Sequence, residues 1–173
     1  MLDEQSSIGE GDGTKQIVTR TQIAKMAGTD VTHFLNQRAR FVAKSLGDQA
    51  GLQNVGVHLI NLPVGAVASA FHRHLCADEC IYILEGSGVA RIGPDLFQIE
   101  AGDFIGYPAG GEAHDIRNTG STHMICLVVG QRLEFDIIDY PEQNKRLYRY
   151  AGQPPDLVDI AAVSHPRLSD HHG

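Results

Sequence analysis

Short runs of Val, Ile and aromatic residues alternate with turn residues along most of the chain after about residue 38. The runs recur at a spacing of roughly 8 to 12 residues, which is typical of an all-β sandwich or barrel. Glycine and proline separate them, because these residues supply the positive or fixed φ angle at which an extended chain reverses. The pattern predicts strands over 38–44, 55–62, 66–74, 79–85, 87–92, 96–100, 103–107, 113–117, 122–129 and 133–139.

Both ends of the chain depart from this strand pattern. Residues 1–15 are small, polar and acidic, and are expected to form a frayed tail. A short helix or turn is expected between Thr21 and Leu35, and the prolines after Gly152 indicate a loosely attached extension. No internal repeat is visible. We therefore expect one domain, with a tail and a short helical or irregular segment over 1–34, a barrel over 35–150 and an extension over 151–173.

Composition and charge narrow the range of partners. The 173 residues are enough for one domain with a proper core. Lys and Arg number 14 against 21 Asp and Glu, and the net charge of −7 argues against nucleic acid and anionic membrane as partners. No apolar run approaches the roughly 20 residues of a membrane span, and the acidic N-terminus is unlike a signal peptide. Three cysteines cannot all pair within one chain, which favours reduced thiols and a cytoplasmic location.

The chain has nine histidines, and two of them are spaced for shared chemistry. His72 and His74 lie two residues apart in a predicted strand, where such residues point to the same face about 7 Å apart. Two imidazoles at this distance can converge on one ion. Glu79 stands at an odd offset from His74, so it enters the same interior only if the chain reverses within 75–78.

A third histidine, His114, comes from a later hairpin, just after the glycine-rich loop 108–111. Three imidazoles and one carboxylate suit Fe(II), Mn(II), Ni(II), Zn(II) or Co(II). A single histidine in a strand is more often structural than a metal ligand. The metal interpretation therefore depends on the joint pattern of the four residues.

That joint pattern resembles the two motifs of the cupin superfamily. Residues 65–86, GAVASAFHRHLCADECIYILEG, are similar to the first motif, and residues 102–118, GDFIGYPAGGEAHDIRN, to the second. The resemblance covers about 35–150 and is closest to small single-domain bacterial cupins. It implies an all-β double-stranded β-helix, or jelly roll. It also implies one divalent transition metal, Fe(II), Mn(II), Ni(II) or Zn(II), held by His72, His74, Glu79 and His114.

The chain departs from the cupin motifs at two loops. Six residues rather than five separate Gly65 from His72, and three rather than two separate Gly110 from His114. Neither change removes a ligand, but the second reshapes the loop that carries the last one.

Several other residues are interpreted as structural or exposed. Cys76 lies in the predicted turn and Cys80 points outward, so neither is expected to bind the metal. His58 has an ambiguous face and is assigned a structural role, while His123 is expected at the surface and Asp103 in a turn. Strand alternation instead points three apolar residues into the interior: Ile81, Ile83 and Ile116.

The leading functional hypothesis is a metal-dependent enzyme of the oxygenase type acting on a small organic molecule. A non-oxidative lyase, isomerase or decarboxylase is the close alternative, because a Lewis-acid metal also stabilises an enolate. A non-catalytic module that binds a small ligand or a metal stays open as well, because the fold and the metal do not determine the function. No acid or base can be named from the sequence. We also expect a homodimer. The apolar strands of 35–62 lie outside the motif pair, and a partner subunit commonly covers the unpaired backbone groups of such edge strands.

Overall fold

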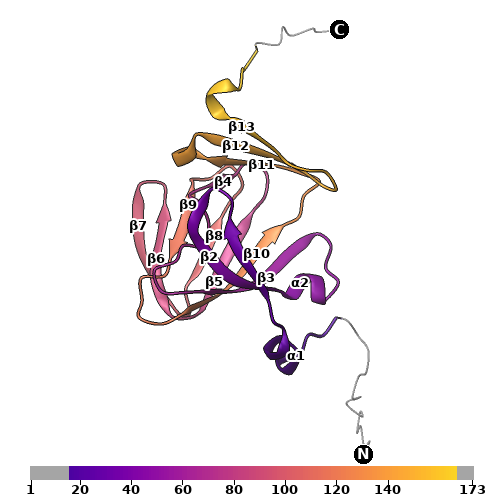
Figure 1. Ribbon diagram of the computed structural model, residues 1–173, viewed down its shortest axis with the longest axis vertical. Helices are drawn as coiled ribbons and strands as arrows, with labels where there is room; N and C mark the ends of the chain where they lie inside the picture. Colours follow the sequence, from indigo (N-terminus) through magenta and orange to yellow (C-terminus); the bar gives the residue numbers. More distant parts are fainter. Residues whose placement is uncertain (1–15, 167–173) are drawn as a thin grey trace, which may run out of the picture.

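The computed structural model describes residues 16–166 and consists mainly of antiparallel strands in three sheets (Figure 1). The predicted all-β jelly-roll class is confirmed. The first sheet has the order β1 (Thr29–His33), β2 (Asn36–Ser45), β3 (Val55–Leu62), β10 (Met124–Gln131), β5 (Glu79–Glu85), β8 (Phe104–Tyr107). No helix within residues 16–166 is long and apolar enough to cross a membrane.

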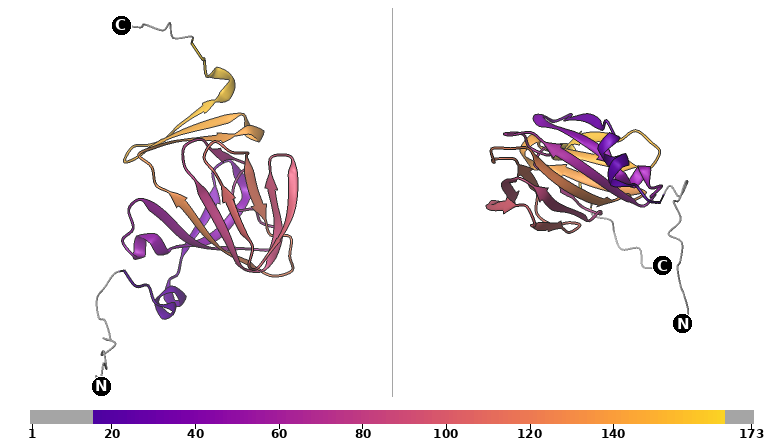
Figure 2. Two further views of the ribbon diagram at one scale, coloured as in Figure 1. Left: turned by 180° about the vertical axis from the view of Figure 1, so that it is seen from behind. Right: turned by 90° about the horizontal axis from the view of Figure 1, so that it is seen from below.

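Two smaller sheets complete the barrel. One has the order β13 (Asp156–Asp159), β12 (Lys145–Tyr150), β11 (Phe135–Tyr140), β4 (Arg73–His74), and the other β7 (Asp95–Glu100), β6 (Ser87–Ile92), β9 (His114–Arg117). The sheet of β11–β13 lies across one end of the molecule in both Figure 1 and Figure 2. Short helices stand outside the sheets: α1 (Arg20–Lys25), α2 (Leu46–Gln49), and the 3-10 turns Pro141–Gln143 and Ile160–Ala162.

The interior is filled by rows of side chains that cross β3, β10 and β5 in register. At one end Met124 pairs with Leu62, and the next row joins Cys126 to Ile60 and Ile83; all five are buried. Burial of each large aliphatic side chain contributes about 1.5–3 kcal/mol, so these rows anchor the barrel.

Toward the other end of the barrel, the rows contain polar residues and glycines. Val128 joins His58 to Ile81, and the last row joins Gly130 to Gly56 and Glu79. Two glycines in one row leave the interior empty beside the carboxylate. Of the three isoleucines predicted to face inward, Ile81 and Ile83 are buried in β5, and Ile116 is buried in β9.

Gly86 turns the chain from the first sheet into the third. Its φ is +84°, and a Cβ atom there would lie 2.8 Å from the carbonyl oxygen of His123. A side chain is therefore excluded on both backbone and steric grounds.

The structure corrects parts of the predicted strand map. The strand predicted over 66–74 is wrong except for Arg73–His74, because the preceding residues meet β9 only through isolated bridges at Val67 and His72. The segment 21–35 holds the end of α1, as expected, but also strand β1, which was not predicted. Strands β12 and β13 were also not predicted, because their sequences KRLYRY and DLVD lack a clear apolar alternation. The tail predicted over 1–15 lies outside the described residues.

Candidate metal centre

Each of the three sheets contributes to one cluster of histidines and a carboxylate. His74 ends β4 in the sheet of β11, Glu79 begins β5 in the large sheet, and His114 begins β9 in the third sheet. His72 is held against His114 by two backbone hydrogen bonds, His72 N to His114 O at 3.1 Å and His114 N to His72 O at 2.7 Å. The reversal predicted within 75–78 is present, but it carries the chain from one sheet to another rather than between neighbouring strands.

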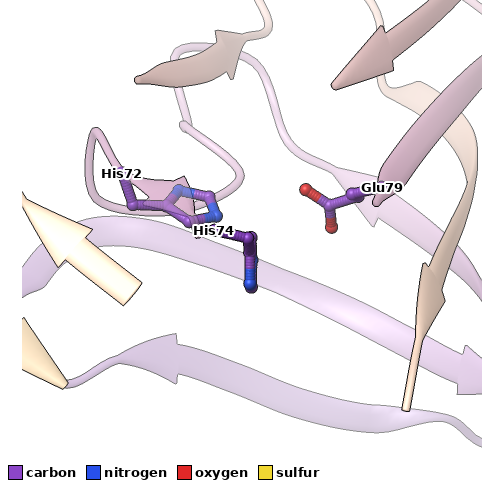
Figure 3. A group of neighbouring side chains, drawn as sticks. All are labelled: His72, His74 and Glu79. Atoms are coloured by element: carbon purple, nitrogen blue, oxygen red, sulfur yellow. The ribbon is translucent and has the colours of Figure 1, made fainter. Parts of the chain in front are cut away.

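The ligand atoms of this cluster lie close together. His72, His74 and Glu79 each offer one nitrogen or oxygen atom, and these atoms all lie within 4.8 Å of one another. The carboxylate of Glu79 points toward the two histidines (Figure 3). His114 adjoins the group, with Nε2 3.3 Å from Glu79 Oε2 and its ring 4.8 Å from that of His72. The structure thus brings all four sequence-predicted residues together, and three of them form a group that could hold a metal ion.

The Nδ1 atom of each of the three imidazoles lies within hydrogen-bonding distance of an oxygen atom. His72 Nδ1 lies 2.9 Å from the carbonyl oxygen of Ala70, His74 Nδ1 lies 2.6 Å from Asp136 Oδ2, and His114 Nδ1 lies 3.2 Å from the carbonyl oxygen of Glu112. These acceptors place the proton of a neutral ring on Nδ1 and leave the Nε2 lone pair available. In this tautomer His114 Nε2 and Glu79 Oε2 present lone pairs to each other, an arrangement that a cation between them would satisfy. The donor set therefore fits a divalent transition metal.

Asp136 is the buried carboxylate that orients His74. It is fully buried, and Oδ1 accepts hydrogen bonds from the backbone N–H groups of Cys76 and Ile137 at 3.2 and 2.9 Å. Oδ2 accepts from His74 Nδ1 and from Arg149 Nη2, the latter at 3.3 Å. Sequence reasoning missed this residue. The signal in the sequence is the position of Asp136, two residues before Ile138 and four before Tyr140. This spacing puts the carboxylate on the apolar face of the strand.

Burial and neighbouring groups set the protonation states of His72 and Glu79. Loss of water around His72, reinforced by the neighbouring His114, lowers the pKa of His72 to about 4. Burial alone would raise the pKa of Glu79, but the neighbouring His114 imidazole, followed by those of His72 and His74, holds that pKa below its ordinary value. At neutral pH His72 is neutral and Glu79 is ionised, which are the forms that bind metals.

Two cavities adjoin the cluster, and His74 and Glu79 line both. The first, of about 200 Å³, is walled by His72, His114 and the aromatic residues Tyr107 and Tyr140. Tyr107 stacks on His114 with ring centroids 3.6 Å apart. Its buried hydroxyl has no hydrogen-bond partner within the described part of the chain, and burial raises its pKa, so it stays a protonated donor. A buried hydroxyl without a partner is a hydrogen-bond donor that a water or ligand could satisfy.

The second cavity, of about 180 Å³, carries polar groups that the sequence did not single out. Arg132, Arg149 and Gln131 line it, together with His58. His58, which was assigned a structural role, shares its row with Ile81 and therefore faces the interior. A larger hollow of about 550 Å³, between β1, β2 and the loop 63–66, contains no histidine in its lining.

The residues set aside from the sequence behave mostly as expected. Cys76 and Cys80 are free thiols, and His123 is exposed and hydrogen-bonded to Asn61. Asp103 is the predicted turn residue, because its Oδ2 accepts a hydrogen bond from the backbone N–H of Glu100 at 2.8 Å.

Comparisons with known proteins agree with this architecture. The cupin domain model matches residues 58–130, which contain the whole cluster. The chain belongs to the cupin superfamily. A candidate sugar phosphate isomerase from Acidithiobacillus ferrooxidans is 42% identical over 89% of this chain and 98% of its own, with a TM-score of 0.86.

Two further cupins of known structure are more distant. A sugar phosphate isomerase of the cupin superfamily from Silicibacter pomeroyi is 26% identical over 84% of this chain and 92% of its own, with a TM-score of 0.69. A predicted oxalate decarboxylase from Thermotoga maritima is 25% identical over 68% of this chain and 100% of its own, with a TM-score of 0.55. A search of curated proteins finds no significant match.

Proposed function

We propose that this cupin is a metal-dependent enzyme whose ion is held by His72, His74, Glu79 and His114. The observation that carries the proposal is the set of three imidazoles whose Nδ1 atoms are all held by oxygen acceptors, so that their Nε2 lone pairs are left for one centre beside an ionised carboxylate. Fe(II), Mn(II), Ni(II) and Zn(II) suit these ligands. When bound, such an ion polarises a substrate carbonyl or hydroxyl oxygen as a Lewis acid.

For the reaction we favour isomerisation of a small phosphorylated sugar, in which a proton moves between neighbouring carbons. Support comes from the 42% identical relative, which matches nearly its whole length and is described as a candidate sugar phosphate isomerase. The first cavity suits this chemistry, because Tyr107, which lines it, carries a protonated, unpaired hydroxyl. That hydroxyl would donate a hydrogen bond to a substrate oxygen on which negative charge develops.

The oxygenase favoured by the sequence is the second candidate. The observation in its favour is the donor set itself, because His72, His74 and Glu79 with the adjoining His114 can leave coordination positions open for oxygen and substrate. The two candidates differ in their demand for oxygen, which makes them separable in one assay.

The test is to load the full-length chain with each metal and incubate it with aldose and ketose phosphates in D₂O, under air and under nitrogen. Proton and phosphorus NMR follow the products. Isomerisation predicts interconversion of aldose and ketose under both gases, with deuterium incorporated at the carbon that exchanges its proton. Product formation that requires air and consumes oxygen would instead support the oxygenase, and tight binding without any product would support a non-catalytic module.

A further inference from the structure

We propose that the second cavity, floored by Gly56 and Gly130 and lined by Arg132 and Arg149, is the subsite that binds the phosphate group of the substrate. This inference rests on the proposed function, since it names where that substrate's charged end lies. It explains why the barrel has an empty, arginine-lined compartment directly beside the candidate metal ligands.

The empty space comes from the last row of the barrel. Gly130 pairs with both Gly56 and Glu79, so all three positions face the same side of the sheet. The two preceding rows carry side chains at the positions of these glycines, His58 and Val128 in one row and Ile60 and Cys126 in the other. A Cβ atom at Gly56 would lie 3.2 Å from His58 Nε2 and 3.4 Å from Arg132 Nε, so glycine keeps these nitrogen atoms accessible.

The two arginines retain donors for an oxyanion. Within residues 16–166, the hydrogen bond of Arg149 is from Nη2 to Asp136 at 3.3 Å, which leaves Nε and Nη1 unpaired. Arg132 binds the carbonyl oxygen of Leu52 through Nη1 and Asp48 through Nη2, which leaves Nε unpaired. Planar guanidinium groups with spare N–H donors match the geometry of phosphate.

The charge of the surrounding groups permits an anion once the metal is bound. The carboxylates near the cavity are Glu79 and Asp78 in its lining, with Asp48 and Asp136 paired to the arginines. A divalent cation would offset two of these four charges and the arginines the other two, so a phosphate meets no net negative field. The hollow at Arg73, Arg91 and Arg146 is different, because no candidate metal ligand lines it.

The test is calorimetric titration of the full-length, metal-containing chain with inorganic phosphate, compared with acetate. Arg132→Gln should weaken phosphate binding at least about tenfold, because one charge-assisted hydrogen-bond donor is lost. Gly130→Ala should also weaken it, because the added methyl occupies the cavity 4.0 Å from Glu79 Cγ without a clash. Arg91→Gln is the matched control, with a side chain as exposed as that of Arg132 at 34%, and should bind phosphate like the parent.

Thermal unfolding and metal content of each variant establish that fold and ion are retained. Phosphate affinity that is equal in the parent and in Arg132→Gln, or absent in the parent, would overturn the subsite. Acetate binding as tight as phosphate would also overturn it, since a phosphate subsite should prefer the tetrahedral dianion. Because binding is measured without turnover, arginine-dependent phosphate binding in a chain that isomerises nothing would refute the proposed isomerisation and leave the subsite standing.

Discussion

Replacing Asp136 by asparagine should weaken metal binding by about 10- to 100-fold, the usual effect of losing a carboxylate that orients a ligating histidine. Asp136 Oδ2 lies 2.6 Å from His74 Nδ1 and also accepts from Arg149. The two backbone N–H donors on Oδ1 would retain the asparagine carbonyl oxygen in place. The new NH₂ group would then face two other donors, so His74 would lose both its acceptor and its fixed tautomer.

The expected loss corresponds to about 1.4–2.8 kcal/mol of metal-binding free energy. Asp139→Asn is a suitable control, because Asp139 lies on the same strand, is also buried, and binds Arg73 and Arg146 but no histidine. Both variants remove a buried charge paired with arginine, so both should lower the free energy of unfolding. Only the Asp136 variant should lose metal affinity.

The assay is competition with a chelator of known affinity, combined with urea unfolding of the metal-free proteins. Equal metal affinity in the parent and the Asp136 variant would refute the role of Asp136 in orienting His74. An equal loss of affinity in both variants would show that the effect comes from general destabilisation.

Three further predictions concern pH, charge and assembly. Because His72 has a pKa of about 4 in the folded chain and about 6.5 as an exposed histidine, the unfolded chain binds the extra proton between these pH values. Lowering the pH from 7 to 4 should therefore cost the metal-free protein up to about 3 kcal/mol of unfolding free energy, and distinctly less in His72→Gln, as measured by urea titration. Glu79→Gln should retain part of the metal but lower isomerase turnover at least about a hundredfold, and undiminished turnover would exclude a need for its charge. Light scattering should give a homodimer of about twice the 18.8 kDa chain mass, and a monomer at micromolar concentration would contradict this.

The sequence predicts those parts of the fold and site that depend on local periodicity. His72 and His74 could be paired from their spacing, and the inward direction of Ile81 and Ile83 from the alternation that starts at Glu79. The convergence of the three histidines on Glu79 was accessible only because the two cupin motifs carry it.

Features that depend on strand register could not be predicted from the sequence. Asp136 meets His74 because β11 pairs with β4, and these residues are 62 positions apart in the chain. The row of Gly56, Gly130 and Glu79, in which two positions have no side chain, likewise arises from pairing across three strands. Each glycine alone is consistent with a turn or a weak strand, so neither indicates a cavity by itself.

The most direct test of the metal centre is elemental analysis of the untagged protein and of His74→Ala, His114→Ala and the surface control His123→Ala. We expect about one transition-metal ion per chain in the parent and in the control, because the four ligands form one site. The His74 and His114 variants should lose most of their metal, since each removes one of few bonds to the ion. Full metal occupancy in the His114 variant, or a parent chain that binds no transition metal when supplied with one, would contradict the assignment.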